Sequence, residues 1–244
     1  MNYDFLISLA DKYENPDFII GDPSFFMHQV SGEENQETIA LVASTLSYGA
    51  RSQFMPKIDL LLKASDGLFY EWIKTGAYND SIPRDTSCFY RLYNNTMMLN
   101  FLDALRRMLK EYHTIGNAVK TNANDGLKAI NFFCNYFTPS TLIPHSITSP
   151  CKRLAMFLRW MVRIDSPVDL GLWKFIDRRT LVIPLDTHVI KQSHQLGLMT
   201  QRNPTMKTAI MLTDKMRTIF PDDPTRADFA LFGLGVNSKP KTEN

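Results

Sequence analysis

Cysteine is scarce in this chain, and long apolar runs are missing from it. Its three cysteines, Cys88, Cys134 and Cys151, lie far apart among 244 residues. This spacing excludes a disulfide framework and argues against a zinc or iron–sulfur site, whose ligands cluster in the sequence. No run of about 18 apolar residues is present, so we expect no transmembrane helix. The opening segment MNYDFLISLADKYENP carries acids and lacks a basic region before an apolar core, so we expect no signal peptide.

The chain also lacks an excess of charge of either sign. It has 27 Lys and Arg residues against 25 Asp and Glu residues, a formal net charge of +2, which excludes a polybasic arm. Its hydrophobic content of 44% and charged content of 21% are typical of a soluble globular protein. Scattered cysteines favour a reducing cytoplasm. A chain of this length can form one large domain or two lobes, each with a proper core.

Apolar residues recur at helical spacing along most of the chain. We predict helices over residues 3–14, 36–49, 53–63, 66–75, 96–112, 125–136, 151–163, 168–176, 187–196, 205–219 and 225–234. We predict connections over residues 76–86, 117–124 and 139–150. The last of these contains three prolines and is the best internal boundary. With at most a few residues of strand near Leu181–Ile183, the sequence predicts an all-α protein.

The strongest local signal lies in LVIPLDTHVIKQSHQLGLM, residues 181–199. Pro184 near the entry, Asp186 at the start and Gly197 past the end are helix start and stop signals. A carboxylate at this start accepts hydrogen bonds from free backbone N–H groups and lies at the positive end of the helix dipole. Asp186 is therefore expected to cap the helix, which is the commonest role of such an acid. The same fixed position suits a carboxylate that faces a developing positive charge.

A second candidate site is Ser149-Pro150-Cys151-Lys152-Arg153, where a turn leads into a helix. The backbone N–H groups of a helix start suit a phosphate, and the two basic residues add positive charge there. From Lys152 to Lys191 the chain has eight basic and four acidic residues, a net +4 within a chain of +2. This predicts a local positive face of the kind that a nucleic-acid site needs. A solvated helix face of mixed charge is the alternative.

Several conspicuous side chains are expected to be structural. Trp160 and Trp173 are predicted to lie in the core and not to serve as base-stacking platforms. His188 and His194 are six residues apart and do not share a helix face, so they predict no metal pair.

The PLDTHV segment resembles the aspartate motif of the helix-hairpin-helix (HhH-GPD) DNA glycosylases, the superfamily of endonuclease III and the 8-oxoguanine glycosylases. There a Val-Asp-Thr/Val-His run opens a helix, and its aspartate is the catalytic acid/base, which implies this role for Asp186. In the bifunctional members a lysine near the start of the second hairpin helix attacks the sugar, which implies Lys152. The 34-residue spacing is more like that of the archaeal 8-oxoguanine glycosylases. If the alignment with the superfamily shifts by one residue, Arg153 takes the position of the catalytic lysine. An arginine stays protonated and cannot act as the nucleophile in practice.

Other parts of the resemblance concern DNA contacts. The glycine-rich hairpin turn that grips phosphates in the superfamily is Ser-Pro-Cys here, and the resemblance implies phosphate contacts from Ser149, Arg153 and Arg159. The segment ETIALVASTLSYGARSQF resembles the early helix and turn whose glutamine wedges into the duplex. Gly49 replaces that glutamine, so Tyr48 or Arg51 is the implied wedge. His188 is implied as a structural or substrate-edge group.

Taken together, the likeness runs from about residue 36 to residue 235 and points to an uncharacterised bacterial branch. It implies a single two-lobed all-α unit over residues 1–244 with the cleft between the lobes. Lobe one would be residues 36–164, a helical barrel with the hairpin near residues 145–163. Lobe two would be residues 1–35 plus 165–244.

The function implied is DNA repair by a base-excision N-glycosylase, with or without AP-lyase activity, acting on a damaged base, with an oxidised base as one candidate. We expect a monomer on double-stranded DNA in the bacterial cytoplasm, at the nucleoid, without metal or organic cofactor. The side chains of Lys152 and Asp186 should converge within about 6–8 Å. Two alternatives stay open, a catalytically inactive nucleic-acid-binding protein of the same fold and a helical interaction protein without a nucleic-acid role. Affinity that falls steeply with salt would exclude the last one.

Overall fold

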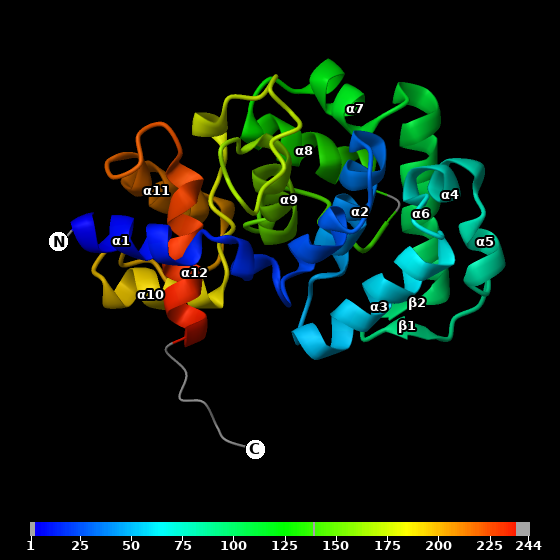
Figure 1. Ribbon diagram of the computed structural model, residues 1–244, viewed down its shortest axis with the longest axis horizontal. Coiled ribbons are helices and arrows are strands. Elements are labelled where there is room, and N and C mark those ends of the chain that lie inside the picture. Colours follow the sequence, from blue (N-terminus) through cyan, green and yellow to red (C-terminus); the bar gives the residue numbers. More distant parts are fainter. Residues whose placement is uncertain (1–2, 139, 238–244) are drawn as a thin grey trace. The chain divides into compact units, whose positions relative to one another are not determined.

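The computed structural model describes residues 3–138 and 140–237, which are mostly helical (Figure 1). Contacts divide the chain into two compact units. Unit 1 comprises residues 1–18, 125–127 and 147–244, and unit 2 comprises residues 19–124 and 128–146. The prediction of a helical protein is confirmed. The lobes expected from the sequence differ from these units mainly in placing residues 147–164 in lobe one and residues 19–35 in lobe two, and the lobe boundaries stay a prediction.

Unit 1 is built around the C-terminal helix. Its main helices are α1 (Tyr3–Tyr13), α9 (Lys152–Val162), α10 (Thr187–Gln195), α11 (Met206–Arg217) and α12 (Ala227–Asn237), with short 3₁₀ helices at Arg178–Thr180 and Pro224–Arg226. The apolar helix α12 is buried along most of its length, and both α1 and α10 pack against it (Figure 1). Gly233 permits the close approach of α1, because a Cβ atom there would lie 2.3 Å from Cγ of Tyr13.

A buried arginine near the end of α9 joins distant parts of unit 1. Arg163 is 1% exposed. Its Nε lies 2.9 Å and 3.0 Å from the two carboxylate oxygens of Asp223, and its Nη2 lies 2.7 Å from Oε1 of Glu14. Its Nη1 donates to Asp169. Burial alone would lower the pKa of Arg163, but these three carboxylates raise it well above its ordinary value, so the guanidinium stays charged.

A second buried arginine, Arg159, lies one turn earlier on the same face of α9. It forms ion pairs with Asp169 and with Asp228 of α12. The guanidinium groups of Arg159 and Arg163 lie 4.3 Å and 5.2 Å from the ring centroid of Phe229. Charge pairing and cation–π contact therefore fix α9 against α12 in one register.

Unit 2 is a second helical core. It contains the 3₁₀ helix η2 (Pro23–His28), α2 (Glu33–Leu46), α3 (Arg51–Ala64), α4 (Phe69–Thr75), α5 (Tyr78–Ser81), β1 (Cys88–Tyr90), β2 (Tyr93–Asn94), α6 (Asn95–Tyr112), α7 (Ile115–Asn122) and most of α8 (Gly126–Tyr136). A further 3₁₀ helix, η1, spans Pro16–Ile19. Helix α2 is buried from Glu37 to Leu46 and forms the centre of this core. Strands β1 and β2 pair antiparallel, with Cys88 opposite Asn94.

One predicted connection is a helix. Residues 117–124 belong largely to α7, whose start the sequence analysis missed. Thr114 caps this helix through the backbone N–H of Asn117, at 3.0 Å. The buried carboxylate of Glu37 accepts the N–H groups of Ile115 and Gly116 at 2.6 Å and 3.0 Å. A partner 78 residues away thus completes the cap, and no local pattern shows it.

Three other local predictions are wrong. Residues 168–176 form no helix, α2 ends at Leu46 and not at Gly49, and the connection predicted over residues 76–86 contains the short helix α5. Leu181–Ile183, where we expected at most a few residues of strand, is buried and contains none. The N–H of Ile183 donates to Oγ1 of Thr213 at 3.0 Å, so a side chain of α11 takes the place that a neighbouring strand would have.

Replacing Arg163 by methionine should lower the free energy of unfolding by about 3–5 kcal/mol, because it leaves buried carboxylates without their cation. Urea denaturation followed by circular dichroism measures this change. The matched control is Arg179→Met, which removes an exposed arginine paired with Asp177 and should leave the urea midpoint unchanged. Equal midpoints for the wild type and Arg163→Met would contradict the anchoring role of Arg163.

Candidate functional site

Lys152 and Asp186 meet in unit 1, each at the start of a helix. Lys152 is the first residue of α9, and Asp186 is the N-cap of α10. The Lys152 Nζ atom lies 3.2 Å from Oδ2 of Asp186. Their side chains are 32% and 14% exposed, so solvent reaches the pair. The expected convergence of the two side chains is confirmed and is closer than expected, whereas their catalytic roles stay predictions.

The backbone of α10 fixes the direction of the Asp186 carboxylate. Its Oδ1 accepts the N–H of Val189 at 2.8 Å, which confirms the predicted cap. The backbone carbonyl of Asp186 accepts the N–H of Ile190 at 2.9 Å, the first bond of the helix. One carboxylate oxygen is thus held by the helix and the other faces the amine.

A strained residue precedes the amine. Cys151 adopts the left-handed conformation, with φ at +45°, which a non-glycine residue rarely takes. Its side chain is buried, and its carbonyl accepts the N–H of Ala155 at 3.0 Å. Ser149 lies beside it, with Oγ 3.5 Å from the cysteine sulfur. This sharp turn sends the chain into α9 with Lys152 in the first position.

The charges of this pair affect the pKa of a buried carboxyl group nearby, which was not predicted from the sequence. Asp228, near the start of α12, is bonded to Arg159. Burial raises the pKa of Asp228 to about 6. The charges of Arg159 and Lys152 oppose this rise, and those of Asp186 and Asp169 add to it. The available signal was an acid in the otherwise apolar run ADFALFGLGV, since a buried acid needs a buried partner.

The DNA contact predicted for Arg159 is not supported by its position in the structure. It is 2% exposed and engaged by two carboxylates, so it is not available to a phosphate. Arg163 is equally buried. The predicted positive face between Lys152 and Lys191 therefore loses two of its eight basic residues to the interior. The predicted core positions of Trp160 and Trp173 are confirmed.

The other predicted contacts are dispersed over both units. Arg153 is half-buried and follows Lys152 in α9, and the ring of His188 packs against Phe232 at 6.0 Å. Tyr48 and Arg51 belong to unit 2. Tyr48 is 42% exposed and lies 5.0 Å beneath the guanidinium of Arg91. Nη2 of Arg51 lies 3.0 Å from Oδ2 of Asp22.

Two further features bear on the class of protein. Within residues 3–138 and 140–237, no three His, Cys, Asp or Glu side chains are placed to hold a metal ion. Over the same ranges, no helix has both the length and the apolarity needed to span a bilayer.

Asp228→Asn should change how stability depends on pH. Because burial raises the pKa of Asp228 from an ordinary value near 3.8 to about 6, its contribution is fully present below pH 3.8 and is lost as the pH rises through 6. Between pH 4 and pH 7 the wild type should lose about 2.5 kcal/mol relative to the variant. Urea unfolding of both proteins at pH 4 and pH 7 measures the difference. A difference independent of pH would rule out titration of Asp228 in this range.

Comparison with known proteins gives a family without a described activity. A family model described as "Protein of unknown function (DUF2400)" matches residues 22–237. Searches of curated proteins and of solved structures found no match. Since the matched residues make up most of the chain, the protein belongs to the DUF2400 family.

Proposed function

We propose that this protein is a DNA-repair enzyme, a base-excision N-glycosylase with AP-lyase activity on a damaged base. The observation that carries the proposal is the 3.2 Å contact between the Lys152 amine and the Asp186 carboxylate at two solvent-reached helix starts. The resemblance of PLDTHV to the glycosylase aspartate motif supplies the reaction type. The proposed substrate is double-stranded DNA with the target nucleotide turned out of the helix.

The first step frees the nucleophile. Asp186 accepts a proton from the Lys152 ammonium, which leaves the amine with its lone pair. The amine attacks C1′ of the deoxyribose, forming a C–N bond. The bond from C1′ to the base breaks, and its electron pair leaves with the base, which takes up the proton that Asp186 had accepted and so returns Asp186 to the carboxylate form. The positive charge that develops on the sugar faces the carboxylate that the α10 backbone holds in place.

The second step produces the intermediate that can be trapped. The new secondary ammonium first gives one proton to the Asp186 carboxylate, which frees the nitrogen lone pair. The bond from C1′ to O4′ then opens, O4′ takes up this proton from Asp186, and the nitrogen lone pair forms a C=N bond to C1′. The product is a Schiff base between Lys152 and the opened sugar. Borohydride delivers hydride to C1′ and converts this linkage into a stable amine.

Borohydride trapping with matched variants tests the proposal. The probes are labelled duplexes that carry an abasic site or an oxidised base. The wild type should form a covalent adduct, and Lys152→Arg should form none, because it keeps the positive charge beside Asp186 but has no usable nucleophile. Asp186→Asn should slow adduct formation by about 100-fold or more. Lys207→Ala, which removes an exposed lysine of α11 outside the Lys152–Lys191 segment, is the control and should react like the wild type.

Two results would contradict the proposal in different ways. An adduct that persists in Lys152→Arg would remove Lys152 as the nucleophile. Absence of both adduct and base release on every lesion, with salt-dependent DNA binding retained, would identify a binding protein without the chemistry.

A further inference from the structure

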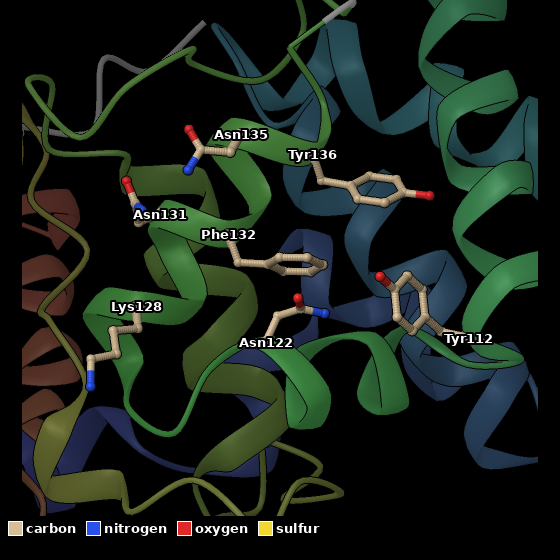
Figure 2. A pocket seen from close by; sticks show the side chains of 7 residues that line it. All are labelled: Tyr112, Asn122, Lys128, Asn131, Phe132, Asn135 and Tyr136. Atoms are coloured by element: carbon tan, nitrogen blue, oxygen red, sulfur yellow. The ribbon is translucent and has the colours of Figure 1, made fainter.

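Unit 2 carries a pocket of about 460 Å³ that the proposed chemistry does not use. Residues of α6, α7 and α8 line it (Figure 2). Its apolar walls are the rings of Tyr112, Phe132 and Tyr136, and its polar lining includes the amides of Asn122 and Asn131. The pocket therefore combines flat aromatic surfaces with amide groups.

The spacing along α8 explains why these groups gather. Lys128, Phe132 and Tyr136 are four residues apart and lie on one helix face. The opposite face carries Ile130 and Phe133, both fully buried, and anchors α8 in the core. Half-buried rings on the outer face are thus not required to fill the core.

Tyr136 is a fixed wall of the pocket. Its ring packs against Phe132 and Tyr112, with centroids 5.7 Å and 6.4 Å apart. Its hydroxyl donates to Oε2 of Glu111 at 3.2 Å. Burial, followed by this carboxylate, raises the pKa of Tyr136 to about 12, so the hydroxyl stays neutral. Figure 2 shows Phe132 and Tyr136 reaching from α8 toward Tyr112.

Polar groups near these rings are open to a ligand. Nδ2 of Asn122 donates to the carbonyl of Ala118 at 2.8 Å, which leaves its Oδ1 as an acceptor. The Asn131 side chain is exposed and belongs to the pocket lining, so its side-chain amide can reach a ligand. Lys128 is exposed and adds a cation, with Nζ 2.9 Å from Oδ1 of Asn124. Stacking surface, amides and a cation are what proteins use to bind an unpaired base and its phosphate.

We infer that this pocket binds an unpaired nucleobase of a nucleic-acid strand, stacked on Phe132, with amides at its edge and Lys128 toward a phosphate. The cation favours a charged ligand over a neutral sugar ring, which also stacks on aromatic residues. This site lies in unit 2, whereas the Lys152–Asp186 pair lies in unit 1, so the inference goes beyond the proposed function and does not depend on it.

Fluorescence anisotropy of a labelled 12-nucleotide single strand tests the inference. Phe132→Leu keeps an apolar side chain but removes the flat ring, and it should weaken binding about tenfold. The matched control is Phe25→Leu, which removes a partly exposed phenylalanine elsewhere in unit 2 and should leave affinity unchanged. Lys128→Gln should make the dependence of affinity on salt less steep. A free nucleoside monophosphate should displace the strand, whereas maltose should not.

Three outcomes would overturn the inference. They are equal affinities of the wild type and Phe132→Leu for the strand, displacement by maltose, and absence of single-strand binding. Borohydride trapping reports separately on Lys152, so the two proposals can fail independently. A protein that binds the strand through Phe132 but forms no adduct would lose only the proposed chemistry, and the converse would remove only this pocket.

Discussion

The two arginines buried in α9 impose the constraint on which unit 1 depends. A charge removed from water must be paired, and Arg159 and Arg163 find their carboxylates in segments from residue 14 to residue 228. Shifting α9 by one residue would turn both guanidinium groups away from these acids and from the ring of Phe229. Apolar packing alone tolerates such a shift better than charge pairing does. The network therefore sets both the position and the rotation of α9.

The same helix face carries the amine of the candidate site. Arg159 follows Lys152 by seven residues, which is two helical turns or about 10 Å along the axis. Fixing the arginine in the interior therefore fixes the direction in which the first residue of α9 leaves the preceding turn. Asp186 reaches that point from the start of α10. Helix α10 packs on the central helix α12, which also carries Asp228, the partner of Arg159. The 3.2 Å contact is thus a consequence of interior packing as well as of two helix starts.

The parts that the sequence predicts well are those with local causes. Helix periodicity and the Pro184–Asp186–Gly197 pattern are contained in short segments, so most helices and the Asp186 cap are confirmed. The failures involve distant partners. Glu37 completes the cap of α7 from 78 residues away, and the carboxylates that bury Arg159 could not be assigned from its own segment. Counting charges along a segment treats every arginine as exposed, and for this reason it overestimated the positive face.

Two carboxyl groups at opposite ends of the arginine network, Glu14 and Asp228, have pKa values that are shifted in opposite directions. Burial alone would raise the pKa of Glu14, but the charges of Arg163 and Arg226 outweigh this effect. The pKa of Glu14 is therefore lower than its ordinary value, and the carboxyl group stays ionised. Burial raises the pKa of Asp228 to about 6. Its ion-pair partner Arg159 opposes this rise, and the negative charge of Asp186 adds to it. Keeping Asp228 ionised at neutral pH therefore costs about 3 kcal/mol relative to an ordinary carboxyl group. Asp228, whose burial is not fully offset by its cation, is also the group whose pKa is affected by the charges of Lys152 and Asp186. Groups with shifted pKa values concentrate at functional sites but also occur in structural ion-pair networks, so the chemistry proposed for Lys152 and Asp186 rests on their geometry and not on this shift.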